Sequence, residues 1–229
     1  MAWATIEGEI RGRLAETSTT GFWTSLDLAR YFNDWVGIQH SEVFKRALAI
    51  ERPGFGQSYE NEYLQAFLKV RQMVTVSGRQ DYDLPNDYWR MARVFLGTSP
   101  PIAAESVNFT DDYQVRLGGR RAPSPRRPLY AIIPNAAKAQ VRLYIAPGDR
   151  TVPNAVLPFT LHYFGTPVRV DRVASPPIDT DLPVQFQKAP IAGACYLALL
   201  KERTEGSAFR DEAMKHIDTI FPAPSVEVN

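Results

Sequence analysis

The spacing of apolar residues along this chain changes twice, and these changes constrain the fold more than any other feature of the sequence. Up to about residue 70 the apolar residues mostly recur every three or four positions, which is the spacing of an amphipathic helix. From 71 to 177 many of them alternate with polar residues, as they do in a strand with one buried face. Near the C-terminus the helical spacing returns. This order predicts an α+β protein.

Residues 82–97 lie soon after the first change and have the sequence YDLPNDYWRMARVFLG. The beginning of this stretch is predicted to form a rigid corner. Pro85 fixes its own φ angle, has no N–H to donate, and pushes Leu84 towards an extended conformation. Asn86 and Asp87 can bond back to nearby backbone and therefore favour a turn. The predicted structural corner comprises Asp83, Leu84, Pro85, Asn86 and Asp87.

Residues 89–96 follow the corner with the alternation of a strand, and both faces of that strand are largely apolar. The pattern predicts a strand that ends at Gly97. Strict alternation would place Met91 and Val94 on opposite faces of it. Shorter β-type segments continue to residue 164, several of them separated by glycine, proline or asparagine, as in a small sheet or sandwich.

Two of the helices predicted before the corner have features that bear on packing. The first covers residues 3–15, where Gly8 and Gly12 lower the intrinsic helix stability but would permit another helix to approach closely. The last covers residues 59–70, with its aromatic and leucine side chains directed inward. The first helix is therefore expected to be held in place by contacts with other helices.

The helix between these two has a clear start in the sequence FWTSLD. Thr24 or Ser25 can cap the first free N–H groups, and Asp27 favours the positive end of the helix dipole. Gly37 is a candidate for a bend or a break. A further amphipathic stretch, residues 41–49, follows that glycine.

Two more helices are predicted near the C-terminus, and Pro190 either kinks the first of them or marks its first turn. The simplest assembly packs the helices from both ends of the chain together. We therefore predict that residues 1–70 and 178–229 form a helical bundle domain, into which residues 71–177 are inserted as an antiparallel β domain.

The composition limits the classes of function that are open to the chain. The net charge is +1 over 229 residues, so the total charge indicates neither nucleic acid nor an anionic membrane as a partner. Cys195 is the only cysteine, which excludes an internal disulfide. The N-terminus lacks the pattern of a signal peptide, and the longest apolar run, residues 191–200, is too short to cross a bilayer. We expect a protein that acts away from membranes.

The sequence contains no GxSxG, HExxH, GxxxxGK[ST] or CxxC motif. His40, His162 and His216 lie on three separate segments, so a catalytic triad or a metal site is disfavoured. Cys195 lies on the apolar face of a predicted helix, which is typical of a buried and unreactive thiol. We therefore expect no catalytic residue, no cofactor and no metal site.

Arginines gather in one Gly- and Pro-rich segment of the β region, RLGGRRAPSPRR. Two interpretations stay open. The first is a solvated flexible loop. The second is a contact with an acidic surface of a partner or with the backbone of nucleic acid. The segment has no interleaved aromatic residues, which argues against stacking on single strands. The candidate contact residues are Arg116, Arg120, Arg121, Arg126 and Arg127.

The order of these motifs resembles that of tailed-bacteriophage head-to-tail adaptor proteins, also called connector or head completion proteins. The likeness spans most of the chain, and the closing pair of Ala-rich helices is similar too. It is carried by FWTSLDL at 22–28 with YFN at 31–33, YDLPNDY at 82–88, LYAIIP at 129–134, LYIAP at 143–147 and LHYF at 161–164.

The resemblance implies a structural virion protein and no enzyme. Such proteins form a ring below the portal, commonly with the twelvefold symmetry of the portal, so a dodecamer is expected. The ring would bind the portal protein and tail or nozzle proteins, and packaged DNA would pass through its lumen without sequence readout. The protein would be made in the host cytoplasm and located in the virion neck, between head and tail.

Other classes of function stay open. One is a carbohydrate- or peptide-binding β module with helical support, which would suit exposed aromatic residues such as Tyr113 and Tyr130. The other is a hydrolase with an unrecognised site, for which the sequence gives the least support. The mass in solution, alone and with a portal protein, would separate the ring-forming adaptor from a monomeric sugar-binding module.

Overall fold

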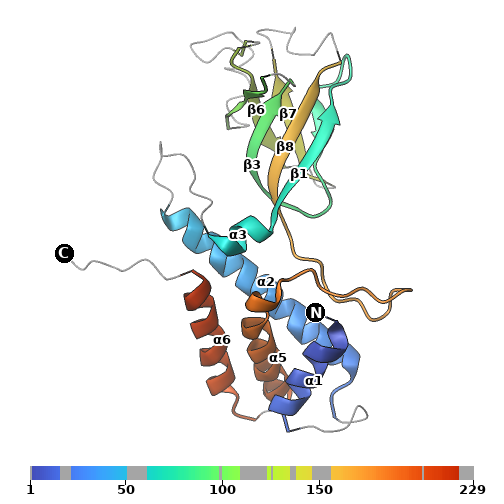
Figure 1. Ribbon diagram of the computed structural model, residues 1–229, viewed down its shortest axis with the longest axis vertical. Coiled ribbons are helices and arrows are strands. Elements are labelled where there is room, and N and C mark those ends of the chain that lie inside the picture. The colour runs from blue at the N-terminus through green and yellow to red at the C-terminus, as the bar shows by residue number, and fades with distance from the viewer. Residues whose placement is uncertain are drawn as a thin grey trace, which may run out of the picture. The chain divides into compact units, whose positions relative to one another are not determined.

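The structure is a computed structural model, and its described residues form two compact units (Figure 1). The helical unit comprises Met1–Phe67 and Pro167–Asn229, and the β unit comprises Leu68–Thr166. Helices and sheets are thus segregated, which confirms the α+β class. That the helices form a bundle with an inserted β domain stays a prediction. The described residues are 2–15, 22–50, 61–97, 100–108, 123–124, 126–134, 138–145, 156–202 and 204–221, without the side chains of 48–50.

Helices from both ends of the sequence pack on one another in the helical unit. The α5 helix contacts each of α1, α2 and α6, and it is the central helix among those described (Figure 1). The described helices are α1 (Trp3–Arg13), α2 (Ser25–Ile50), α3 (Glu62–Ala66), the short 3-10 helix η3 (Val184–Phe186), α5 (Lys188–Lys201) and α6 (Ser207–Ile220).

The α5 helix can be central because its side chains are small. Its alanines Ala192, Ala194 and Ala198 are fully buried. Gly193 lies directly against the indole ring of Trp35 on α2, where an added Cβ would overlap the ring atoms. Close helix approach was predicted instead for Gly8 and Gly12, but a Cβ at either position would meet nothing within 4 Å. That prediction was wrong, because both glycines of α1 face open space.

The α2 helix is continuous over 26 residues. Its start is capped as predicted: the Asp27 N–H donates to Thr24 Oγ1 at 3.1 Å, and the Thr24 N–H donates to Asp27 Oδ2 at 3.2 Å. Of the two expectations for Gly37, the break was wrong, since one Gly costs only about 1 kcal/mol in a helix and packing can supply more than that, and the bend stays a prediction. No helix in the described residues is both long and apolar enough to cross a membrane.

The helix predicted for residues 59–70 is wrong in its second half. Asn61 caps a short α3, with its Oδ1 accepting the N–H groups of Tyr63 and Leu64 at 2.9 and 3.3 Å. The chain then enters a strand at Leu68, because it pairs there with a neighbouring strand. Pairing across the sheet satisfies the backbone and outweighs the local helical spacing.

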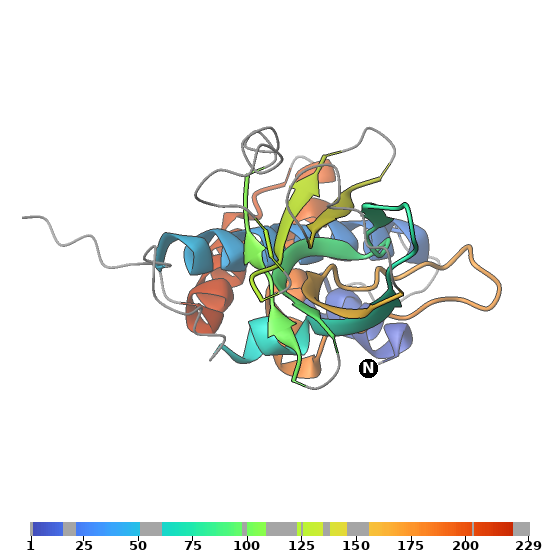
Figure 2. The same cartoon turned by 90° about the horizontal axis from the view of Figure 1, so that it is seen from above.

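The β unit consists of two sheets (Figures 1 and 2). Among the described residues, all strand pairs are antiparallel except β5 with β6, which is parallel. The first sheet has the order β1 (Leu68–Val74), β8 (Pro158–Gly165), β3 (Tyr88–Leu96) and β4 (Ile102–Ala103). The second has the order β2 (Asp81–Asp83), β7 (Gln140–Tyr144), β6 (Leu129–Ile133) and β5 (Glu105–Ser106).

The β3 strand departs from the strict alternation that the sequence predicts. Its pairing with β8 shifts register between Tyr88 and Arg90 and again between Met91 and Arg93. A residue inserted in this way changes which face the following side chains occupy. Met91 and Val94 therefore both lie in the core, at 7% and 0% exposure, rather than on opposite faces.

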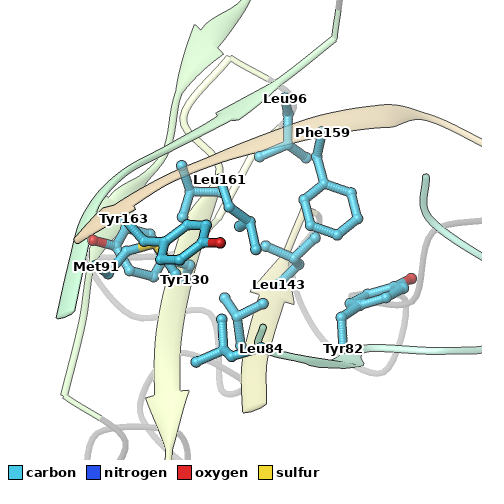
Figure 3. Close-up of a cluster of buried hydrophobic side chains, with 11 residues drawn as sticks. Tyr82, Leu84, Met91, Leu96, Tyr130, Leu143, Phe159, Leu161 and Tyr163 are labelled. Carbon is cyan, nitrogen blue, oxygen red and sulfur yellow. The ribbon is translucent and has the colours of Figure 1, made fainter. Parts of the chain in front are cut away.

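The core of the β unit lies between its two sheets (Figure 3). Phe159 from β8 packs against the ring of Tyr82 from β2, with ring centroids 5.1 Å apart. Leu161 and Leu143, from opposite sheets, are fully buried in the same cluster. Tyr130 belongs to this cluster too and is 7% exposed, so its predicted exposure was wrong.

Candidate interaction surfaces

The predicted arginine segment is only partly within the described residues. Arg116, Arg120 and Arg121 lie outside them. Arg126 is exposed. Arg127 is exposed as well, but its guanidinium donates from Nε and Nη2 to the two carboxylate oxygens of Glu105, at 2.9 and 2.7 Å. The positive charge of Arg127 therefore already has a partner within the β unit.

The predicted corner contains a turn, because the Tyr88 N–H donates to the Pro85 carbonyl at 3.0 Å. Leu84 is buried in the core and anchors this turn. Asp87 connects the corner to two strands of the first sheet. Its side chain accepts hydrogen bonds from Lys69 Nζ at 2.8 Å and from the Tyr163 hydroxyl at 3.2 Å.

The backbone of Asp87 adds a third link, since its carbonyl accepts the Thr166 N–H at 2.7 Å. Lys69 and Thr166 lie next to the two points where the chain passes between the units. Gly165 permits this close packing, because a Cβ there would lie 2.9 Å from Lys69 Cδ and 3.1 Å from Asp87 Oδ2. Asp87 thus ties the first strand and the last strand of the β unit together at their ends.

The electrostatics of Asp87 favour its charged form. Burial by itself would raise the pKa of this carboxyl, but the hydrogen bond and charge of Lys69 and the Tyr163 hydroxyl outweigh burial. The pKa therefore lies below its ordinary value of 3.8. A carboxyl with a lowered folded-state pKa stabilises the fold above its unfolded pKa, and this stabilisation is lost as the pH falls through the folded pKa.

We predict that Asp87→Asn lowers the free energy of unfolding of the β unit by about 1 kcal/mol at pH 7, the scale of a partly exposed ion pair. The difference from the unmodified protein should shrink as the pH falls below the ordinary carboxyl pKa of 3.8 and through the lower folded-state pKa, where Asp87 takes up its proton. Urea unfolding over a pH series measures this. Asp83→Asn is the matched control, because Asp83 bonds only the neutral Gln140 amide in the described contacts. An equal, pH-independent loss in both variants would contradict the prediction.

The helical unit carries an exposed hairpin, residues 171–178, which we call the arm. It is closed by two backbone hydrogen bonds between Asp171 and Ile178, at 2.9 and 2.8 Å. The turn is held by Asp171 Oδ1, which accepts the N–H groups of Val173 and Ala174. Val173 is 77% exposed and Ile178 is 43% exposed. Both views show the arm extending away from the helices of its own unit (Figures 1 and 2).

Both legs of the arm are tied to helices. The side-chain amide of Asn33 on α2 donates to the Val170 carbonyl at 2.8 Å and accepts the Val170 N–H at 2.9 Å. On the other leg, Asp179 Oδ1 accepts the backbone N–H of Trp3 at 3.0 Å. The arm is therefore held in a defined direction although its tip contacts little of its own unit.

A groove of about 490 Å³ lies elsewhere on the helical unit, between α3, the start of α5 and the end of α6. Of its apolar lining residues, Ile220 is partly exposed and Phe186 and Ala189 are nearly buried, and Glu62 and Lys188 provide exposed charged groups. The groove is lined by Asn61, Glu62, Tyr63, Gln185, Phe186, Lys188, Ala189, His216, Thr219 and Ile220.

The three histidines are not brought together. His40 is buried in the helical unit, where burial lowers its pKa to about 4, and His162 lies in the β unit. His216 lies on α6 beside Glu212, 3.5 Å away. Cys195 is buried on α5, and burial raises the pKa of its thiol to about 12. Within the described part of the chain, no group of His, Cys, Asp or Glu side chains could hold a metal ion.

Comparison with known proteins identifies a family for the chain. A family model described as SU10 adaptor protein matches residues 1–220, a range that includes the whole β unit and most of the helical unit. Among curated proteins the comparison finds no match.

Proposed function

The chain belongs to the SU10 adaptor protein family, and from this we propose that it forms a ring between the portal and the tail of a phage particle. The match over residues 1–220 carries the proposal, because it spans both units rather than one shared module. In this role the protein is structural, and its surfaces rather than a catalytic site do the work.

The exposed edge of the first sheet supports association with other chains. The β1 strand is at the edge of that sheet, and Val70 and Val74 on it are 59% and 55% exposed. Solvent-facing sides of antiparallel sheets are usually polar, and exposed apolar edge strands are usually covered or avoided. An edge of this kind is expected to be covered in an assembled particle.

We propose a dodecamer, matching the symmetry of the portal, that binds the portal protein on one side and tail or nozzle proteins on the other. Packaged DNA passes through the lumen without sequence readout. A net charge of +1 suits this role, since a strongly basic wall would retain the DNA. The protein is made in the host cytoplasm and takes its place in the virion neck.

The arginine segment is proposed as one of the contact surfaces in this assembly. Arg116, Arg120, Arg121 and Arg126 would supply positive charge to an acidic partner surface or to DNA. Arg127 is the least suited of the candidates, because Glu105 already neutralises it. The alternative of a sugar- or peptide-binding module loses the support of Tyr130, which lies in the core, and Tyr113 lies outside the described residues.

The mass of the purified protein, measured by native mass spectrometry alone and with the portal protein, tests the proposal. We expect either a ring of the protein alone or a ring that forms only on the portal, with twelve copies in either case. The double variant Arg120→Glu, Arg121→Glu should lose assembly or DNA retention if the arginine segment is a contact. A chain that stays monomeric with the portal present would contradict the adaptor role.

A further inference from the structure

We propose that the arm of one subunit docks into the groove of the next subunit in the ring. This inference rests on the proposed ring-forming function and names the surfaces that would build the ring. Both surfaces belong to the helical unit.

The arm has the properties of a preformed docking element. Its apolar tip residue, Val173, is 77% exposed, and Pro176 and Pro177 restrict the backbone beside it. Burying exposed apolar surface of this kind lowers the free energy of the complex. Because Asn33 and Trp3 already fix both legs, little conformational entropy is lost when the arm binds.

The groove has the size and chemistry to receive this tip. A volume of about 490 Å³ leaves room for a side chain the size of valine. Ile220, which is partly exposed at the groove, would face Val173, whereas Phe186 and Ala189 are nearly buried. Each surface also carries one charge of either sign, Asp171 and Arg172 on the arm and Glu62 and Lys188 at the groove, so opposite charges are available to pair on docking.

The positions of the arm and the groove on the helical unit indicate which molecule would fill the groove. The arm leaves the helical unit on the side of α1, and the groove lies on the side of α3 and α6, so the arm is directed away from its own groove (Figures 1 and 2). A projection and a groove on different sides of one body make a heterologous contact between copies. Such contacts repeat from copy to copy and close into a ring when the rotation permits. A second copy of this chain is therefore the occupant.

Disulfide trapping tests the contact directly, because the chain has one cysteine and it is buried. Val173→Cys places a thiol at the arm tip, and Thr219→Cys places one at the exposed rim of the groove. On oxidation of the assembled protein, the double variant should give a ladder of linked chains on a non-reducing gel. A mixture of the two single variants should stop at dimers, since each chain then carries only one of the two thiols.

A second measurement uses the strength of assembly. Val173→Asp should weaken ring formation at least tenfold, because it replaces an apolar contact with a carboxylate that would lose its hydration on docking. Leu26→Asp is the matched control, since Leu26 is also an exposed apolar side chain of the helical unit, at 54% exposure, and lies outside the arm and the groove. Equal assembly of the Val173→Asp variant and the unmodified protein would overturn the inference.

The outcomes separate this inference from the proposed function. Rings that form normally while the double-cysteine variant gives no ladder would overturn the arm contact and leave the adaptor role standing. Linking of Val173→Cys to itself would indicate a twofold arm-to-arm contact, and linking to the portal would make the portal the occupant. Either result overturns the inference. A chain that neither assembles nor gives a ladder beside the portal would overturn both.

Discussion

Replacing Gly193 by alanine is expected to destabilise the helical unit by about 3 kcal/mol, the upper part of the usual range for overpacking a core. In an exposed helix the same change would stabilise by about 1 kcal/mol, because alanine has the higher helix propensity. The sign reverses here because the new methyl group would overlap the ring of Trp35. Trp35 is itself 4% exposed, and its ring also packs against Tyr196 on α5, which limits its movement. Urea unfolding followed by circular dichroism at helical wavelengths measures the loss.

Gly37→Ala is the control for this prediction. Gly37 lies within α2, and a Cβ there would meet nothing within 4 Å, so the variant should gain up to about 1 kcal/mol. Gly193→Ala should cost less in a Trp35→Leu background than in the unmodified protein, because the smaller side chain makes room for the methyl group, and a double-mutant cycle measures this difference. A gain in stability for Gly193→Ala alone would mean that α2 and α5 are farther apart than the structure has them.

The sequence predicted features that depend on neighbouring residues in the chain. The α+β class followed from the spacing of apolar residues, and the cap of α2 followed from Thr24 and Asp27 three positions apart. Pro190 lies in the first turn of α5, so it marks the start of that helix and does not kink it. Each of these depends on forces that act within one or two helical turns.

The features that the sequence did not predict depend on partners far along the chain. Leu68 enters a strand because residue 164 pairs with it, and no local pattern shows that partner. The two register shifts in β3 are fixed by pairing with β8, so simple alternation misplaced Met91 relative to Val94. Gly193 could not be distinguished from Gly8 or Gly12 before the position of Trp35 was known.

The candidate surfaces show the same limit. The arginine segment stood out in the sequence because like charges were consecutive, yet Arg127 is paired with Glu105, 22 positions away. The arm gave a weaker signal, since exposed Val173 and Ile178 resemble any apolar residues until their surroundings are known. Asp87 was predicted as a turn residue, and its contacts with Lys69 and Tyr163 could not be read from spacing.

Replacing Phe159 by alanine should affect the β unit more than Asp87→Asn does, lowering its free energy of unfolding by about 3–5 kcal/mol. Phe159 is 1% exposed, lies on the strand between β1 and β3, and faces the second sheet (Figure 3). Its removal would leave a cavity against Tyr82, whose hydroxyl is held by the Val76 N–H and the Arg79 carbonyl, so the site cannot readily collapse. Such a loss is a large share of the total stability of a domain.

Hydrogen exchange followed by mass spectrometry distinguishes a local effect from a general one. In Phe159→Ala, amide protection should fall in the strands of the β unit, while α2 and α5 keep theirs, because the helical unit has its own buried residues. Phe95→Ala, on the outer face of the same sheet, should cost about 1 kcal/mol, since Phe95 is only partly buried. Loss of protection in both units of Phe159→Ala would show that they unfold together, and it would contradict the prediction that the β unit is a separate domain.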